Sequence, residues 1–297
     1  MDPVTLSIVG ILVSAVGVFV SLIYGWGPFR DRYRTQDSPA EAVRPGDTLL
    51  KRIQERGSIR VGFFRYPPLI DRSDSSASTV PVGLYPKLML HVASANNLKV
   101  NFTEIHLSEC TQAVVSAEVD LVLCVFQTPK RYQEVDFAAL LHLVLVTGIV
   151  RSNETRIGTP ADLLREDVRV VVEKGEIGAE FLEQLGVRLG RRRVIQVESD
   201  DYSEIISLVA AGVADVAIVD GASSRRYLAA HPEAALKRAF PRLPLATCPN
   251  GVMLPKGEPS LRDWLTDQFR AARESPQLRA EDAGLLEEWE GIIEKLG

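Results

Sequence analysis

The sequence predicts an α/β protein of two lobes, preceded by one transmembrane helix. Short β-branched apolar segments alternate with amphipathic helical segments, and this alternation stops near residue 150 and then starts again. The N-terminus differs from the rest, because residues 4–24 are almost wholly apolar or small. We therefore expect an anchor (1–29), a linker (30–47), a first lobe (48–149), a second lobe (150–240) and a segment with C-terminal helices that returns to the first lobe (241–297).

Composition narrows the class of function. The chain has 297 residues, of which 46% are hydrophobic and 25% are charged, as in an ordinary globular protein. Its net charge of -5 argues against a nucleic-acid partner, which would require a basic face. The cysteines (Cys110, Cys124 and Cys248) and the four histidines lack metal-type spacing. We expect no metal, no other cofactor and no disulfide framework.

Residues 4–24 predict a helix that spans a membrane. No charged side chain lies between Asp2 and Arg30, and a span needs about 20 apolar residues. Tyr24 and Trp26 would then lie at the membrane interface as an aromatic anchor. A cleaved signal peptide is the alternative, but the segment before the apolar run has no Lys or Arg. We expect a single-pass membrane protein.

The charges that flank this span predict its orientation. Arg30, Arg32 and Arg34 follow it, whereas only Asp2 and the α-amino group precede it. The positive-inside rule therefore places the rest of the chain in the cytoplasm. A polar linker with two prolines and a glycine, Thr35–Asp47, then leads away from the membrane.

Local signals define the elements of the first lobe. Thr48 is a plausible N-cap for a helix that stops at Gly57. The order of strands and helices that follows indicates a largely parallel sheet with helices on both faces. The expected strands are 58–63, 100–105 and 120–125, and the expected helices are 86–95 and 111–117.

The second lobe repeats this pattern after an apolar, β-branched stretch from Leu140 to Arg151. Thr159 and Pro160 predict the cap and first turn of a short helix. Strands are expected at 168–172, 194–197 and 216–219, helices at 178–185 and 203–211, and a final strand and turn at 251–257 followed by helices 260–274 and 285–296.

One arginine is a candidate for binding a carboxylate. Arg131 follows the end of a predicted strand and precedes the segment Val135–Phe137. The guanidinium is a planar fork of donors that matches a carboxylate, and it stays charged at any working pH. A structural alternative is that Arg131 pairs with Glu134 or Asp136.

Five segments occur in the order seen in bacterial solute-binding proteins of family 3, which the chain resembles from about residue 47 to its end. This resemblance implies a type II periplasmic-binding-protein-like fold, in which crossover strands join two lobes and hinge motion closes them on a ligand. The similar segments are Leu49–Gly62, the aromatic and proline loop Tyr66–Leu69, the T-x-x-R-x-x-x-V-D-F segment Thr128–Phe137, Gly212–Asp220, and Val252–Leu261 with Trp289.

The resemblance also implies roles for single residues. Tyr66 would stack on the ligand, Arg131 would bind its carboxylate, and Asp220 would bind its ammonium group. Backbone amides near Gly175–Gly178 would contribute from a helix N-terminus. The predicted ligand-binding set is Tyr66, Cys124, Phe126, Arg131, Glu176, Ile177, Gly178 and Asp220.

Two positions of the predicted ligand-binding set depart from the family pattern, and two further roles have structural alternatives. Phe126 and Ile177 stand where the family often has Ser or Thr, so the pocket suits a more apolar ligand or has lost ligand binding. The alternative role of Asp220 is to cap a helix at 222–227, and the alternative role of Tyr66 is that of a core aromatic residue.

The leading hypothesis is a membrane-anchored binding or sensor protein for a small carboxylate-bearing ligand, an amino acid in the first instance. Its partner would be a transporter permease if the lobes are extracytoplasmic, as is usual in the family, or a signalling protein if they are cytoplasmic. One alternative is a degenerate pair of lobes that serves as a protein-interaction platform. Another is a dehydratase-like enzyme with Glu173 as its general acid.

Overall fold

The computed structural model describes residues 48–73, 80–199, 201–240 and 244–295. The predicted anchor at residues 4–24 lies outside these ranges, as does the linker up to Asp47. Within the described ranges, no helix has both the length and the apolar character that a membrane span needs. The two lobes lie together in one compact unit, Asp47–Gly297.

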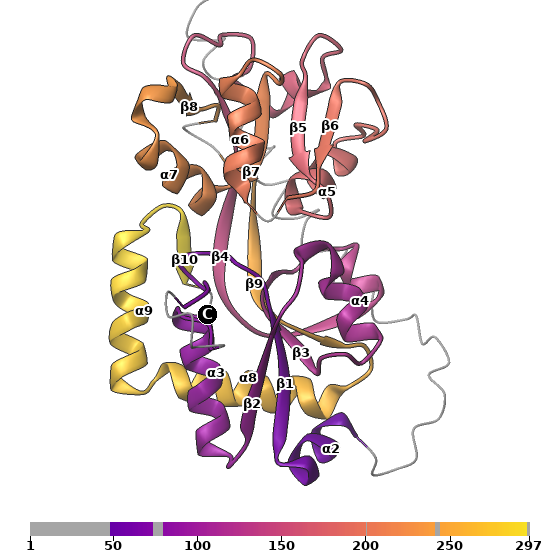
Figure 1. Cartoon of the computed structure of the whole chain (residues 1–297), viewed down its shortest axis with the longest axis vertical. Coiled ribbons are helices and arrows are strands. Elements are labelled where there is room, and N and C mark those ends of the chain that lie inside the picture. Colours follow the sequence, from indigo (N-terminus) through magenta and orange to yellow (C-terminus); the bar gives the residue numbers. More distant parts are fainter. Residues whose placement is uncertain (1–47, 74–79, 200, 241–243, 296–297) are drawn as a thin grey trace, which may run out of the picture. The chain divides into compact units, whose positions relative to one another are not determined.

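The first lobe is built on a parallel sheet whose central strand is β1 (Figure 1). As expected, Thr48 caps α2 by accepting a hydrogen bond from the Lys51 amide, and Gly57 ends this helix with φ of 67°. The elements are β1 Ser58–Phe63, β2 Lys99–Glu104 and β3 Leu121–Phe126, with helices α2 Leu49–Arg56, α3 Leu84–Ala95 and α4 Cys110–Val115 and the 3-10 turns η1 Leu107–Glu109 and η2 Arg131–Gln133.

The second lobe repeats the design, with β5 lying between β6 and β7 in parallel. The predicted turn at Thr159 and Pro160 is present, and Asp162 completes a capping box with Thr159. The elements are β5 Val170–Glu173, β6 Val194–Val197 and β7 Val216–Asp220, helices α5 Ile177–Gln184, α6 Tyr202–Ala210 and α7 Gly221–Ala230, turns η3 Pro160–Leu164 and η4 Pro232–Ala234, and the short strand β8 Leu236–Arg238.

Two long strands, β4 (Val135–Arg151) and β9 (Ala246–Pro255), run between the lobes (Figure 1). They pair antiparallel with each other, β9 pairs antiparallel with β3, and β4 pairs antiparallel with β7. The sheet is therefore mixed, and the expectation of a largely parallel sheet holds only within each lobe. The reason is that each crossover strand runs opposite to the strands that it joins.

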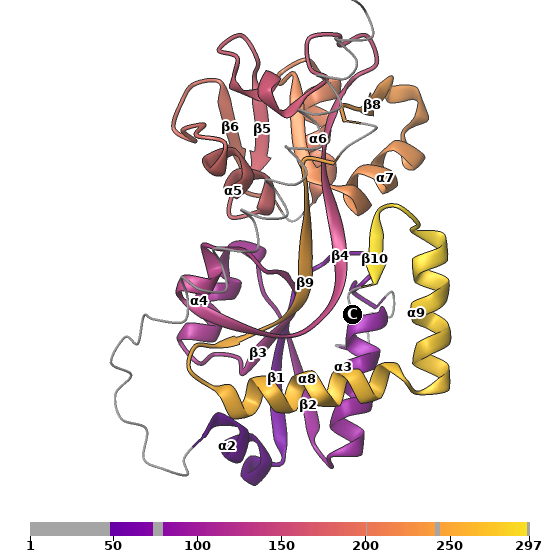
Figure 2. The same ribbon diagram turned by 180° about the vertical axis from the view of Figure 1, so that it is seen from behind.

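The C-terminal segment packs on the first lobe (Figure 2). Helix α8 (Pro259–Arg273) contacts α2 and α3, and α9 (Pro276–Glu288) contacts α3. The predicted last helix at 285–296 is wrong in its position. The helix ends at Glu288, Gly291 adopts φ of 70°, and β10 (Ile293–Lys295) then pairs with β4, so tertiary pairing replaces the last helical turns.

Candidate ligand site between the two lobes

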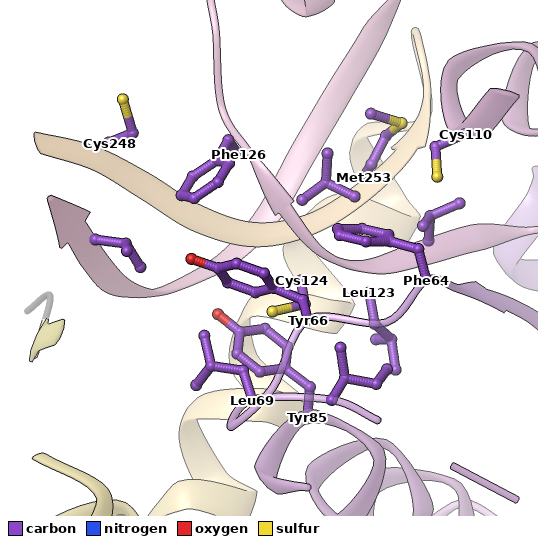
Figure 3. Close-up of a cluster of buried hydrophobic side chains, with 14 of the residues drawn as sticks. Phe64, Tyr66, Leu69, Tyr85, Cys110, Leu123, Cys124, Phe126, Cys248 and Met253 are labelled. Carbon is purple, nitrogen blue, oxygen red and sulfur yellow. The ribbon is translucent and has the colours of Figure 1, made fainter. Parts of the chain in front are cut away.

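Tyr66 is held in a tight loop that follows β1. Its amide donates to the Ile70 carbonyl, and its carbonyl accepts from the Leu69 and Ile70 amides. A Cβ atom at Gly83 would lie 2.4 Å from the Leu69 carbonyl oxygen, so only glycine lets α3 begin this close to the loop. The Tyr66 ring lies edge-on to Phe126, with centroids 5.6 Å apart (Figure 3).

Asp220 is the last residue of β7 and the N-cap of α7, and it is fully buried. Its Oδ1 accepts hydrogen bonds from the Ala222 amide (2.8 Å), the Ser223 amide (3.0 Å) and the Tyr66 hydroxyl (2.9 Å). Its Oδ2 has no hydrogen-bond partner among the described residues. Burial raises the pKa of Asp220 above its ordinary value, although these hydrogen bonds oppose the rise.

Arg131 begins the turn η2 after β3 and is also buried. Its Nη1 donates to the Phe126 carbonyl and its Nη2 to the Gly175 carbonyl, each at 2.9 Å. Its acidic neighbours are Glu176, with an Nη2–Oε1 distance of 3.9 Å, and Glu180, with an Nε–Oε1 distance of 4.0 Å. The structure therefore pairs Arg131 with acids of the second lobe, and not with its sequence neighbours.

Glu176 and Glu180 bring two further carboxylates to the same place. Glu176 is the N-cap residue of α5, and Glu180 follows one turn later on the same face. Both are buried, and one oxygen of each has no hydrogen-bond partner among the described residues. Burial raises the pKa of Glu176 to about 7, against the attraction of Arg131 and with a further contribution from Asp220.

The other predicted ligand-binding residues lie in or beside this group. Cys124 is fully buried in a bulge of β3 with φ of 62°, and its sulfur lies near the rings of Tyr66 and Tyr85 (Figure 3). Ile177 is the buried first residue of α5. At Gly178 a Cβ atom would lie 2.7 Å from the Ile218 carbonyl oxygen, so this glycine lets α5 pack on β7. Direct ligand contacts of these three residues stay predictions.

Two residues that belong to the site were not predicted from the sequence. Glu180 had a detectable signal, because it lies four residues after Glu176 on a predicted helix. Tyr202, the first residue of α6, had none, since it follows a loop without a motif. Burial and the nearby charges of Glu176 and Glu173 raise the pKa of Tyr202 well above its ordinary value. Glu173, the candidate general acid, is buried at the end of β5.

Several solved structures share this fold. A histidine kinase sensor domain with similarity to periplasmic binding proteins is 22% identical, with a TM-score of 0.66 over 79% of this chain and 96% of its own. A solute receptor for L-cysteine from Neisseria gonorrhoeae is 23% identical, with a TM-score of 0.66 over 82% and 96%. The arginine-, lysine-, histidine-binding protein ArtJ from Geobacillus stearothermophilus is 19% identical, with a TM-score of 0.64 over 76% and 94%.

No curated protein matches the chain. The family model of the bacterial extracellular solute-binding proteins, family 3, matches residues 59–291 and so includes both lobes and the return to the first. This family and the structural relatives consist of binding and sensor proteins, and not of enzymes. The chain belongs to the bacterial extracellular solute-binding proteins of family 3.

Proposed function

We propose that this protein is a membrane-anchored receptor that binds a small amine-bearing solute, an amino acid or a related amine, between its lobes. The observation that carries the proposal is the Oδ2 atom of Asp220, which is buried and has no hydrogen-bond partner among the described residues. A buried carboxylate is costly unless it is paired, and an ammonium group supplies both charge and N–H donors. The Tyr66 ring, which donates to Asp220 through its hydroxyl, lies 5.6 Å from the Phe126 ring, and aromatic rings favour a cation.

Hinge closure would couple this binding to a signal. Two hydrogen bonds within the candidate site join the lobes, one from the Tyr66 hydroxyl to Asp220 and one from Arg131 to the Gly175 carbonyl. A ligand can reach Asp220 only after the lobes separate and these bonds break. A solute that contacts both lobes then favours the closed arrangement, and a partner protein reads the difference.

The predicted contact between Arg131 and a ligand carboxylate would form only with an amino acid or another ligand that carries this group. The guanidinium carries five N–H donors, and only two donor nitrogens are engaged by the Phe126 and Gly175 carbonyls. A carboxylate would approach the remaining donors beside Glu176 and Glu180, with which it would compete. A ligand ammonium group that binds Asp220 would not have to compete with an acidic side chain in this way.

The signalling role and the anchor rest on separate observations. A sensor domain of a histidine kinase shares the fold, which supports a sensor at least as well as a transport receptor. The apolar segment 4–24 and the arginines after it support an anchor with the lobes in the cytoplasm, whereas the family is typically extracytoplasmic. A topology reporter fused after Gly297 tests this point. An extracytoplasmic signal would favour a permease partner over a signalling protein.

The direct bonds between the lobes also support a second candidate, an interaction platform that closes without a solute. Tyr66 and Arg131 already bridge to the second lobe, and Phe126 offers no polar side-chain atom to a ligand. A platform of this kind would keep its fold and its partner but respond to no small molecule.

A thermal-shift panel of amino acids and amines on the full-length protein tests the main proposal. A ligand at 100 times its Kd stabilises a protein by about 2.7 kcal/mol. Asp220→Asn should abolish the response without unfolding the protein, because Asn also caps helices. Asp201→Asn is the matched control, since Asp201 is the exposed N-cap of α6 and should leave the response intact. If the panel gives no response, the interaction platform becomes the better account.

A further inference from the structure

We propose that the ligand is an organic amine without a free carboxylate, because the protein's own Glu176 occupies the anion-binding half of the site. This inference rests on the function proposed above and narrows its ligand class. Arg131 and the N-terminus of α5 form the part of the site that would bind a ligand carboxylate. Glu176 is the N-cap residue of α5, and its Oε1 lies 3.9 Å from Arg131 Nη2.

A second acid strengthens this arrangement. Glu180 Oε1 lies 4.0 Å from Arg131 Nε, and the side chains of Glu176 and Glu180 are only 5% and 7% exposed. The guanidinium is thus surrounded by two carbonyl oxygens and two carboxylates. A carboxylate of the ligand would have to enter beside two like charges in a buried place, which the single positive charge of Arg131 does not offset.

The charge balance of the site favours a cationic ligand. Two buried carboxylates, those of Glu176 and Glu180, lie beside one guanidinium, and the buried carboxylate of Asp220 acts on Glu176 as a third negative charge. When all four groups are ionised, two negative charges remain, so a diamine or an amine with a guanidinium group matches the site best. Each of the three carboxylates has one oxygen without a hydrogen-bond partner among the described residues. Ammonium N–H groups would supply these missing donors.

Three side chains of the site also offer no free hydrogen-bond donor to a carboxylate. Phe126 and Ile177 have no hydroxyl, and both are buried. Tyr66 has one, but its hydroxyl already donates to Asp220 at 2.9 Å. The site therefore combines apolar and aromatic surfaces with acceptors of hydrogen bonds, which suits the carbon chain and the charged end of an amine.

Matched ligand pairs test the inference on the full-length protein by isothermal titration calorimetry at pH 8, above the pKa of about 7 of Glu176. The pairs are arginine with agmatine, lysine with cadaverine, and phenylalanine with phenethylamine, whose members differ only in the α-carboxylate. We expect one of the amines to bind about 100-fold more tightly than its amino acid, since a buried like-charge contact is lost. The double variant Glu176→Gln, Glu180→Gln should reduce this affinity gap between the amine and its amino acid at least tenfold.

Glu183→Gln is the control, because it removes a carboxylate from the exposed side of the same helix and should leave the gap unchanged. An amino acid that binds as tightly as its amine overturns the inference but leaves the proposed receptor function intact. A gap that persists in the double variant overturns the role given to Glu176. If the folded protein binds neither member of any pair, the inference and the proposed function fail together.

Discussion

The substitution Glu176→Gln should stabilise the protein at pH 8 and have little effect at pH 4. Burial raises the pKa of Glu176 from 4.5 to about 7, so the folded protein holds a proton that the unfolded chain releases. Stability from this group is complete below pH 4.5 and is lost as the pH rises through 7. The difference between the two pKa values corresponds to about 3 kcal/mol of folding stability. The glutamine variant keeps this stability at pH 8, because glutamine never ionises.

Thermal and urea unfolding from pH 5 to pH 8 would measure this effect. For a domain of this size, 3 kcal/mol corresponds to a rise in Tm of about 6 °C or more at pH 8. The control Glu183→Gln, on the exposed side of α5, should not show a gain of this size. A Glu176→Gln protein that is equally stable or less stable at pH 8 would refute the reasoning. It would mean that Arg131 stabilises the ionised carboxylate by more than burial costs.

Two further substitutions test the packing around the site by urea unfolding. Tyr66→Phe should cost about 1–3 kcal/mol, because it removes the hydroxyl that donates to the buried Asp220; an unchanged midpoint would show that this bond adds nothing. Gly178→Ala should cost about 1–3 kcal/mol, because its Cβ would lie 2.7 Å from a carbonyl oxygen of β7. The matched Gly284→Ala meets no atom within 4 Å in α9 and should be neutral or stabilising; equal effects of the two changes would contradict this account.

The sequence predicted best those features that depend on neighbouring residues. The start of α2 at Thr48, its end at Gly57 and the turn at Thr159 all follow from side-chain caps or from a glycine in the left-handed region. These interactions span three or four residues, so the sequence contains both partners. The repeated order of strands and helices likewise predicted a parallel sheet in each lobe.

Features that depend on distant partners were harder to predict. Strand β4 has 17 residues, and its apolar run gave no sign that it pairs with β7, β8, β9 and β10. The sequence predicts a helix over the short strand β10, because the strand partner of Ile293, Val144, is distant in the sequence. A sequence pattern records the period of an element but not the identity of its neighbour.

In the candidate site, too, single motifs were predicted from the sequence, whereas contacts between distant residues were not. Motifs identified Tyr66, Arg131 and Asp220, and the structure brings all three together with Glu176. The motifs did not predict that Arg131 would face two acids, because this contact forms only when the second lobe meets the first. A pattern that indicates a carboxylate-binding arginine in isolation therefore leads to a different ligand class once its neighbours are known.

Asp220 shows why capping and ligand binding are not competing roles for one carboxylate. Its Oδ1 accepts from the two amides of α7 and from Tyr66, which fixes the side chain, while its Oδ2 has no hydrogen-bond partner among the described residues. The helix thus orients the group that would bind an ammonium ion. Asparagine preserves the first role because its amide oxygen can replace Oδ1, but it removes the negative charge. For this reason, Asp220→Asn separates binding from folding more cleanly than alanine would.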